Sequence, residues 1–416
     1  MERREARGGT LILGGGFAGS YVARLVGRRG STILSPENYM LYTPLLPEAG
    51  AGTIEPRHVV VPLRQMCPHA ELVLGRATTL DESRKVVVAD TLAGPYEIAY
   101  ERLVIALGAV PRVAPVPGLR EHGLAFKDLA DAIALRNRVL HQLERASIRS
   151  APEELGFVFV GAGYAGVEAL AELKDLAEAA LRHYPNLRDV PQRWVLVDAA
   201  PKILPEIPRR LGEYAAEHLA RHEVEIHVST TLESYDGAEA LLSDGTRIPA
   251  RTLVWTAGVR AHPLLAELGL PLDEQGRILV DETLRVRERE DVWALGDCTA
   301  VPNAKTPGAL DPPTSQHALR QARRLAKNLR ARRPRPYGYR MLGQVATLGH
   351  YKGIAEIPGL RLRGFLGWFV ARTYHLYQLP LFTRKLRVVM DWTVALFFRR
   401  DIVEISALGH PRKLGE

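Results

Sequence analysis

The chain has 416 residues, of which 46% are hydrophobic and 25% are charged. This composition is typical of a globular protein with sizeable cores, and the length favours two or three domains over one. The two cysteines, Cys67 and Cys298, exclude a disulfide framework and a CxxC redox pair, while the net charge of +8 suits an anionic partner without naming its class.

The first predicted element follows a charged start, MERREARGG, which carries no apolar signal-peptide core. We therefore expect the protein to stay in the cytoplasm. A buried strand at residues 10–13 leads into a GxGxxG turn, and residues 21–26 continue as a helix. The glycines of this turn are Gly14, Gly16 and Gly19. In this context they permit a tight turn, a close approach to a pyrophosphate and close helix packing, and the helix N-terminus faces the anion.

In such a unit, an acidic residue at the end of the next strand commonly contacts the ribose hydroxyls. Here the next strand, STILS at residues 31–35, ends in Ser35, and Glu37 follows two residues later. Either residue suits the role, and the sequence does not choose between them.

A second copy of the same pattern lies near the middle of the chain. Residues 155–160 are the predicted strand and residues 167–176 the predicted helix. The glycines of this copy are Gly161, Gly163 and Gly166. The strand that follows, RWVLVDAA, ends in Asp198, whose carboxylate can accept hydrogen bonds from both ribose hydroxyls. Two copies, each between a strand and a helix, predict two dinucleotide sites on one chain.

The last part of the chain changes in character. Residues 320–340 are rich in arginine, and such a run at helical spacing is usually a solvated helix face. From Leu360 large apolar residues mix with Arg and Lys, and helical spacing aligns five of them, namely Leu386, Val389, Met390, Val394 and Phe397. Asp391 interrupts the apolar run before it reaches the ~20 residues that a membrane span requires. The pattern favours an interfacial helix, with a helix buried in a homodimer interface or in the core as the alternative.

Several motifs resemble those of flavoprotein pyridine-nucleotide oxidoreductases with two dinucleotide-binding domains, and most of all the type II NADH:quinone oxidoreductases. The motifs are LGGGFAG, SPENYMLYTPLLPEAGAGTIEPRHV, LVIALGAVPR, VGAGYAGVE, VWTAGVRAHPL, VWALGDCTAVP and PPTSQHALRQA. The similarity implies an α/β fold with two doubly wound, Rossmann-like domains and a C-terminal amphipathic, membrane-facing region. The implied domains are residues 1–120 and 270–345 for FAD, residues 121–269 for NAD(P)H, and residues 346–416 for membrane association.

The resemblance also assigns the sites. It implies FAD in the first glycine turn and NADH, as substrate, in the second. Further cofactor contacts are implied for Thr43, Pro44 and Leu45 in YTPLLPE, Ala106 and Gly108 in LVIALGAVPR, Ala257 and Gly258 in VWTAGVRAHPL, and Asp297 in ALGDC. We expect Glu168 in the first turn of its helix, where the dipole favours a carboxylate and where the family has a glutamate close to the nicotinamide and flavin.

Gln316 is the implied quinone contact, in a segment that resembles the AQxAxQ signature of the family. Ser315 and Arg320 depart from that signature, which leaves the other quinone contacts open. Glu168 and Gln316 are thus the two residues to which the resemblance gives catalytic roles.

The sequence lacks the cysteine pairs that related flavoenzymes use. Disulfide reductases need a CxxxxC pair, which residues 30–60 do not contain, and sulfide:quinone oxidoreductases need paired cysteines, whereas Cys67 and Cys298 are predicted to be packing thiols. The histidines His317, His350 and His375 are scattered along the sequence and are predicted to be structural, and we expect no metal site. Aromatic residues for base stacking occur only at the end of the basic stretch, so we expect no nucleic-acid partner.

These observations predict an FAD-dependent oxidoreductase of the respiratory chain that transfers electrons from NADH to a membrane quinone without pumping protons. A sulfide:quinone oxidoreductase-like flavoprotein and a flavin-bearing nucleic-acid-binding protein are the alternatives. We expect a peripheral, monotopic protein on the cytoplasmic face of the cell membrane.

Overall fold

The computed structural model of the protein describes residues 2–149, 152–341 and 343–404. The chain forms two compact units. The first consists of Met1–Tyr42, Val60–Val110 and Val259–Met341, and the second of Thr43–Val59, Pro111–Gly258 and Leu342–Glu416. The predicted α/β class with Rossmann-like units is confirmed. Two of the boundaries, near residues 110 and 258, precede the predicted domain limits at 120 and 269. The short strands β10 (Ala109–Pro111) and β19 (Val259–Ala261) pair at these boundaries. Residues 43–59, which the resemblance placed in the FAD segment, belong to the second unit.

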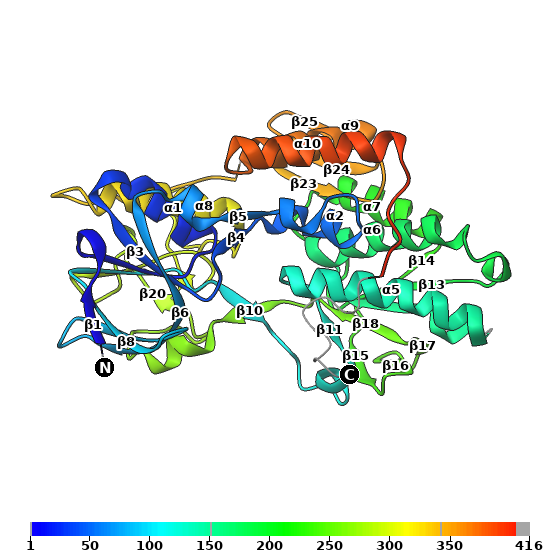
Figure 1. Ribbon diagram of the computed structural model, residues 1–416. Coiled ribbons are helices and arrows are strands. Elements are labelled where there is room, and N and C mark those ends of the chain that lie inside the picture. The colour runs from blue at the N-terminus through cyan, green and yellow to red at the C-terminus, as the bar shows by residue number, and fades with distance from the viewer. Residues whose placement is uncertain (1, 150–151, 342, 405–416) are drawn as a thin grey trace, which may run out of the picture. The chain divides into compact units, whose positions relative to one another are not determined.

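An eight-stranded sheet forms the body of the first unit (Figure 1). Its order is β1 (Glu2–Glu5), β8 (Gly94–Ala99), β7 (Val86–Thr91), β6 (Ala70–Asp81), β3 (Ser31–Ser35), β2 (Thr10–Leu13), β9 (Arg102–Ile105) and β21 (Val292–Ala294). Strand β2 is parallel to both of its neighbours, β3 and β9. Helices α1 (Phe17–Val26) and α8 (Ser315–Asn328) pack against each other, and α1 also contacts β2 and β3. In an open parallel sheet, ligands bind where the strand order reverses, which here is the carboxyl end of β2.

The remaining elements of the first unit are short. They are β4 (Tyr39–Leu41), β5 (Val60–Pro62), β20 (Ile278–Leu279), β22 (Thr299–Ala300) and helix α3 (Leu63–Met66). The strands β2 and β3 are fully buried, which explains their continuous apolar sequences.

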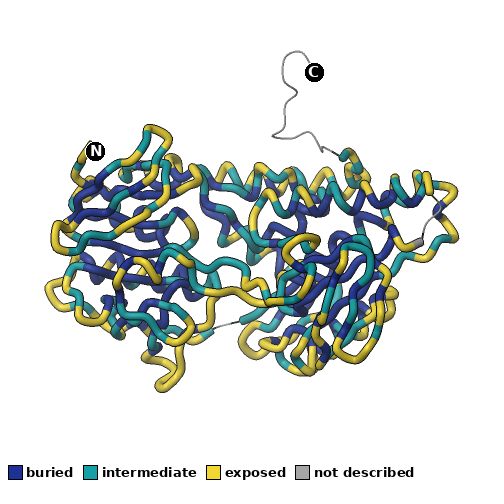
Figure 2. Tube along the Cα trace, turned by 90° about the horizontal axis from the view of Figure 1, so that it is seen from below, coloured by how far each residue is buried: buried dark blue, intermediate teal, exposed yellow. Residues whose placement is uncertain are grey.

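The second unit repeats the plan with an all-parallel sheet of five strands. Its order is β11 (Leu124–Ala125), β18 (Thr252–Trp255), β12 (Gly156–Val160), β13 (Arg193–Asp198) and β14 (Val224–Val228). Its helices are α2 (Leu46–Gly50), α4 (Leu119–His122), α5 (Leu129–Arg149), α6 (Tyr164–Leu181) and α7 (Arg209–Arg221). An antiparallel meander, made of β15 (Leu232–Tyr235), β16 (Glu239–Leu242) and β17 (Arg247–Pro249), shares a hydrophobic cluster with the sheet. Figure 2 shows the buried strands enclosed by exposed turns.

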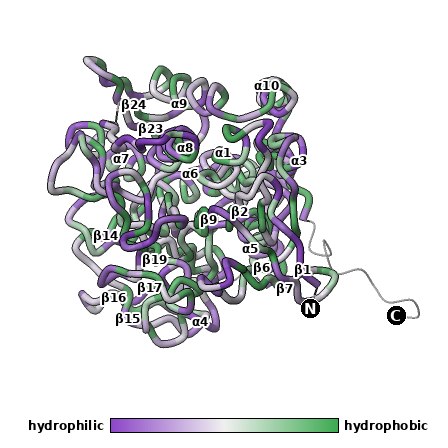
Figure 3. The backbone as a smooth tube through the Cα atoms, turned by 90° about the vertical axis from the view of Figure 1, so that its left-hand side faces the viewer, coloured by the Kyte–Doolittle hydropathy of each residue, from purple (hydrophilic) through white to green (hydrophobic). Residues whose placement is uncertain are grey.

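The C-terminal region belongs to the second unit. It contains the antiparallel strands β23 (Gln344–Thr347), β24 (Gly353–Ile357) and β25 (Leu360–Gly364), followed by helices α9 (Phe365–Gln378) and α10 (Phe382–Phe397). Helix α9 packs on β24, and α10 lies beside α9 (Figure 1). Apolar and polar residues alternate along these two helices (Figure 3).

Both cysteines are buried and unpaired, as predicted for packing thiols. Burial raises the pKa of the Cys67 thiol to about 12, and it raises the pKa of Cys298 as well. Neither side chain is a reactive thiolate near neutral pH.

Candidate functional site

The first glycine turn has the shape that a dinucleotide requires. Gly14 adopts φ 107°, and a Cβ atom there would lie 2.3 Å from the Ala106 carbonyl oxygen. A Cβ atom at Gly19 would lie 2.0 Å from the Gly14 carbonyl oxygen, so any larger side chain would separate helix and turn. Gly16, the N-cap of α1, faces open space with no atom within 4 Å of such a Cβ. Backbone N–H groups at a helix N-terminus border this space, which therefore fits a pyrophosphate.

The second glycine turn reproduces this geometry. Gly161 adopts φ 112°, and a Cβ atom at Gly166 would lie 1.8 Å from the Gly161 carbonyl oxygen. The N-caps of the two helices are superimposable in conformation, with φ −71° and ψ −164° at Gly16 and φ −75° and ψ −173° at Gly163. Gly163 again faces open space. The sequence repeat is therefore also a repeat of structure.

Other predicted cofactor residues lie beside these turns. Ala106 donates its N–H to the Leu13 carbonyl, and a Cβ atom at Gly161 would lie 2.6 Å from the Ala257 nitrogen. Gly108 and Gly258 have positive φ angles, 68° and 85°, and both face open space. In each unit the segment after the neighbouring strand thus borders the glycine turn.

The residues at the ends of the neighbouring strands differ between the units. Ser35 is 3% exposed and packs under the first turn, whereas Glu37 is exposed. Asp198 is half-buried, and its carboxylate accepts hydrogen bonds from the backbone N–H groups of Ala162, at 2.5 Å, and Ala200, at 2.7 Å. Asp198 is therefore fixed directly against the second glycine turn.

In the first unit, Asp297 and the start of α8 line the same small cavity. The Gly296 N–H donates to the Gln321 side chain at 2.8 Å, which ties the ALGDC turn to α8. Gln316 is the second residue of α8 and accepts a hydrogen bond from the Tyr339 hydroxyl at 3.1 Å. The structure thus brings Asp297 and the amino end of the Gln316 helix together.

A buried polar cluster in the wall of this cavity was not predicted. His317 Nδ1 lies 2.8 Å from Asp311 Oδ2 and 3.0 Å from the Tyr337 hydroxyl. Gln321 Nε2 donates to the same Asp311 oxygen at 2.8 Å. The alternation of polar residues in SQHALRQ is the only sequence signal for it. The prediction that His317 is structural agrees with these contacts.

The placement of Glu168 differs from the prediction. Helix α6 begins at Tyr164, directly after the N-cap glycine, rather than at residue 167. Glu168 therefore lies in the second turn, beyond the strongest influence of the helix dipole. It is 8% exposed and accepts hydrogen bonds from the Thr347 N–H at 2.8 Å and the Thr347 hydroxyl at 3.3 Å. Burial nevertheless raises the pKa of Glu168 to about 8, so it is mostly protonated at neutral pH.

Further carboxyl groups lie along the same face of α6. Glu172 pairs with Arg400 at 3.0 Å, and Asp175 lies 3.6 Å from the same guanidinium. Burial raises the pKa of Asp175 to about 6, with the Glu172 carboxylate as the next largest cause. Positions 168, 172 and 175 follow helical spacing, which is a signal that the sequence contained and that we did not use.

Thr43, Pro44 and Leu45, for which the resemblance implies cofactor contacts, form a single 3-10 turn in the second unit. Leu45 is fully buried, whereas Thr43 and Pro44 are partly exposed. Their role at a flavin therefore stays a prediction.

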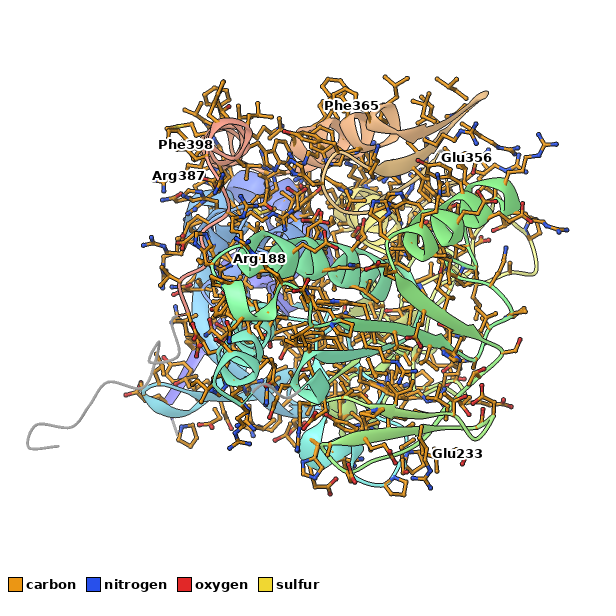
Figure 4. All side chains as sticks on the ribbon, turned by 90° about the vertical axis from the view of Figure 1, so that its right-hand side faces the viewer. Arg188, Glu233, Glu356, Phe365, Arg387 and Phe398 are labelled. Atoms are coloured by element: carbon orange, nitrogen blue, oxygen red, sulfur yellow. The ribbon has the colours of Figure 1, made fainter. Side chains whose placement is uncertain are left out.

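The outer faces of α9 and α10 carry a large set of exposed apolar side chains. All five residues of the predicted stripe are exposed, from 38% at Val389 to 79% at Phe397. The exposed aromatic residues of this region are Phe365, Phe369, Tyr377, Phe382, Phe397 and Phe398. Figure 4 shows Phe365 and Phe398 at the end of the second unit opposite Glu233. Among the described residues, no helix is both long and apolar enough to span a bilayer.

Comparisons with known proteins agree with this geometry. The pyridine nucleotide-disulphide oxidoreductase family matches residues 9–322. A probable NADH dehydrogenase of Dictyostelium discoideum is 31% identical, with 96% of this chain and 93% of that protein covered. The type II NADH:quinone oxidoreductase Ndh of Mycobacterium tuberculosis is 30% identical, over 94% of this chain and 88% of the relative.

A solved structure shares the fold. NDH2 from Plasmodium falciparum, in complex with NADH, has a TM-score of 0.87 at 17% identity, with 97% of this chain and 99% of that chain covered. The resemblance that the motifs indicated is confirmed, and the chain belongs to the pyridine nucleotide-disulphide oxidoreductase family, among its type II NADH:quinone oxidoreductases.

Proposed function

We propose that this chain oxidises NADH with bound FAD and delivers the electrons to a membrane quinone without pumping protons. The observation that carries the proposal is the pair of glycine turns with the same backbone geometry, one in each unit, because the reaction requires two dinucleotides on one chain. FAD supplies the chemistry, since a flavin accepts two electrons as a hydride from NADH and passes electrons on to a quinone.

In the first unit, FAD is assigned to the turn at Gly14, Gly16 and Gly19. The α1 N-terminus favours the pyrophosphate, and the exposed carboxylate of Glu37 is better placed than the buried Ser35 hydroxyl to accept from ribose hydroxyls. Asp297, beside the start of α8, is assigned to the ribityl and phosphate region of FAD.

In the second unit, NADH is assigned to the turn at Gly161, Gly163 and Gly166. The Asp198 carboxylate, held by two backbone N–H groups, is an acceptor for ribose hydroxyls. A 2′-phosphate at the same place would meet a like charge, so NADH is favoured over NADPH. Lys202, four residues further on, reduces this discrimination by its opposite charge.

Gln316 is assigned to the quinone. The Tyr339 hydroxyl donates to Gln316 Oε1, so the donor function of this amide rests with Nε2. A quinone carbonyl requires such a donor. Glu168, mostly protonated at neutral pH, is assigned to the NADH half of the reaction, where it holds a proton at its carboxyl group.

The outer faces of α9 and α10 are assigned to the membrane. Exposed Phe and Leu side chains there, with Arg and Lys between them, suit an interfacial position and support peripheral attachment, which we assign to the cytoplasmic face. A homodimer that covers the same faces is the alternative occupant. The buried Cys67 and Cys298 argue against a sulfide:quinone oxidoreductase.

The test follows both halves of the reaction on purified protein. NADH added without oxygen should bleach the flavin absorbance, and a soluble quinone should restore it. Gln316→Ala should leave bleaching nearly unchanged and slow recovery by at least about tenfold, as expected when one hydrogen bond to a reacting group is lost. If Gln316→Ala slows only the bleaching, the assignment of the quinone site is wrong.

A further inference from the structure

A cavity in the second unit has no part in the function described so far. Its volume is about 680 Å³, within the range of roughly 300–1,000 Å³ that is usual for small-molecule sites. Its walls come from the loop at residues 49–57, the first half of α5, the end of α10 and the segment after α10. All of these belong to the second unit.

Much of the wall is apolar. The apolar side chains include Ile54, Leu129, Ile133, Val394 and Val403. Val394 belongs to the exposed stripe of α10 and is 54% exposed. The apolar wall of the cavity is therefore continuous with the face that we assign to the membrane.

Arg136, on α5, places a positive charge in this cavity. Its side chain is only 8% exposed, and Nη2 donates to the backbone carbonyls of Asp401, at 2.6 Å, and Val403, at 3.3 Å. Nη1 has no hydrogen-bond partner within the described part of the chain, and no described carboxylate lies within 4.0 Å of the guanidinium. A buried charge without an ion-pair partner is unfavourable, so an anion near this guanidinium would stabilise it.

The loop beside Arg136 is shaped around it. Gly52 adopts φ +72°, and a Cβ atom there would lie 2.5 Å from Arg136 Nη1. The Thr53 hydroxyl, which is also buried, lines the same cavity and likewise has no partner among the described residues. Two neighbouring polar groups in one cavity are thus unsatisfied.

The carboxylates in the cavity wall are already engaged. Glu55 pairs with Arg57 at 2.8 Å, and Asp391 lies 2.6 Å from His58 Nδ1. The Asp401 carboxylate accepts from the Val403 N–H at 2.8 Å. Of the four arginines in the wall, Arg57 and Arg400 pair with carboxylates. Arg136 and the exposed Arg399 have no carboxylate within 4.0 Å in the described part of the chain, although the Asp401 charge acts on Arg136 from further away.

We propose that this cavity binds one anionic lipid. The positive charges of Arg136 and Arg399 attract the lipid phosphate, and the acyl chains lie against the apolar wall that leads to α10. A quinone carbonyl can accept a hydrogen bond but carries no negative charge to balance the arginines, whereas a nucleotide has no apolar chain for the wall. The inference rests on the proposed function, because an enzyme that reduces a membrane quinone works at a lipid surface.

The test uses short-chain lipids as monomers, so that adsorption to vesicles does not contribute. Dihexanoyl phosphatidylglycerol, dihexanoyl phosphatidylcholine and inorganic phosphate are each titrated into the FAD-loaded full-length protein below the critical micelle concentration, and Tm is measured. A ligand that binds only the folded state raises Tm in a saturable way. We expect this rise with phosphatidylglycerol and little or none with phosphatidylcholine or phosphate.

Two variants and a control locate the site. Arg136→Gln should weaken phosphatidylglycerol binding by at least about tenfold, because it removes one of the two positive charges that attract the phosphate. Ile133→Trp fills the cavity without a change in charge and should abolish binding, which covers the case that Arg136→Gln fails to fold. Arg138→Gln changes the same charge on the same helix outside the cavity and should bind as the wild type does.

Three results would overturn the proposal. These are equal binding of phosphatidylcholine, an equal effect of inorganic phosphate, which would indicate a free-anion site, and wild-type binding by both cavity variants. Flavin bleaching by NADH and recovery by quinone, measured without lipid, report on the proposed function separately.

Discussion

Gly16 and Gly163 are equivalent residues at the N-caps of α1 and α6, and both face open space. Gly16→Val should give a folded protein that has lost its yellow chromophore, because the side chain fills the space assigned to the FAD pyrophosphate. Gly163→Val should retain FAD and lose NADH binding. Flavin absorbance per chain and NADH titration check both, and each variant is the control for the other. If Gly16→Val retains one FAD per chain, the assignment of the FAD pyrophosphate to the first glycine turn is wrong.

Asp198 carries the expected preference for NADH. Replacement by Ala removes the like charge that a 2′-phosphate would meet, so the ratio of kcat/KM for NADH over NADPH should fall by at least about tenfold. Initial rates with the two cofactors measure it. Asp244→Ala, a surface carboxylate in the same unit, is the control. An unchanged ratio in Asp198→Ala would contradict the role.

Glu168 makes stability depend on pH. Its pKa rises from 4.5 to about 8 on folding, so between these values the native state binds more protons than the unfolded state. Stability contributed by this group is therefore lost as pH rises from about 4.5 to 8, by at most about 5 kcal/mol. Glu168→Gln removes this dependence, and its Tm should gain on that of the wild type as pH increases over this window.

The same substitution tests the catalytic role of Glu168. If the proton on its carboxyl group assists the NADH half of the reaction, stopped-flow bleaching should slow in the wild type above about pH 8 and should be slow and nearly independent of pH in Glu168→Gln. Recovery by quinone should be unaffected. If Glu168→Gln gains Tm relative to the wild type as pH rises but bleaches at the wild-type rate, Glu168 has a structural role and no catalytic one.

At the scale of elements, α10 has one buried side that packs on the protein and one exposed side that we assign to the membrane. Val388 is fully buried, whereas Phe382 and Phe397 are 77% and 79% exposed. Serine at both phenylalanines should weaken liposome binding by at least about a hundredfold, since each exposed aromatic contributes about 1.5–3 kcal/mol on transfer to an apolar phase. Leu92→Ser, at a residue that is 91% exposed in the first unit, is the matched control.

Deletion of the tail after Leu360 is a poorer test than surface substitution. Helix α9 packs on β24 and supplies Arg372, which pairs with the buried Glu48, so the deletion would leave a buried carboxylate without its ion-pair partner. Loss of lipid binding by such a truncation would mix attachment with unfolding. Liposome sedimentation of the double serine variant, with Tm as a check on folding, keeps them apart.

At the scale of the whole chain, contacts across long stretches of sequence hold the second unit together. Arg372 Nη2 lies 2.6 Å from Glu48 Oε2, across 324 residues, and the Trp392 indole N–H donates to the same oxygen at 2.7 Å. Both members of the pair are buried. Burial raises the pKa of Glu48, and the Arg372 charge opposes this rise.

Removal of Arg372 should therefore destabilise the protein in a pH-dependent way. Arg372→Met should cost about 3–5 kcal/mol, as for other buried pairs that lose one partner. Because the Glu48 pKa then rises further, the loss should be larger at about pH 8 than at about pH 6. Urea unfolding at both values checks it, and Glu48→Gln combined with Arg372→Met should recover much of the loss. A constant penalty at both pH values would contradict this account.

The sequence by itself determined the two glycine turns and the alignment of five apolar residues on one side of α10. Each is a local pattern, since strand, turn and helix start lie within about 15 residues, and the 3.6-residue period decides which residues share one side of a helix. That this side is exposed was decided only by the tertiary structure. The family and its reaction followed from the same motifs.

Only the tertiary structure decided the environment of the acidic and basic side chains. Glu168 is mostly neutral because β23 and the helix body bury it, and Glu48 meets Arg372 across most of the chain. Arg136 Nη1 has no hydrogen-bond partner among the described residues, and the loop at Gly52 encloses it. The burial and the partners of a side chain depend on contacts between segments that are distant in the sequence. A local sequence pattern does not indicate which distant segment packs against it.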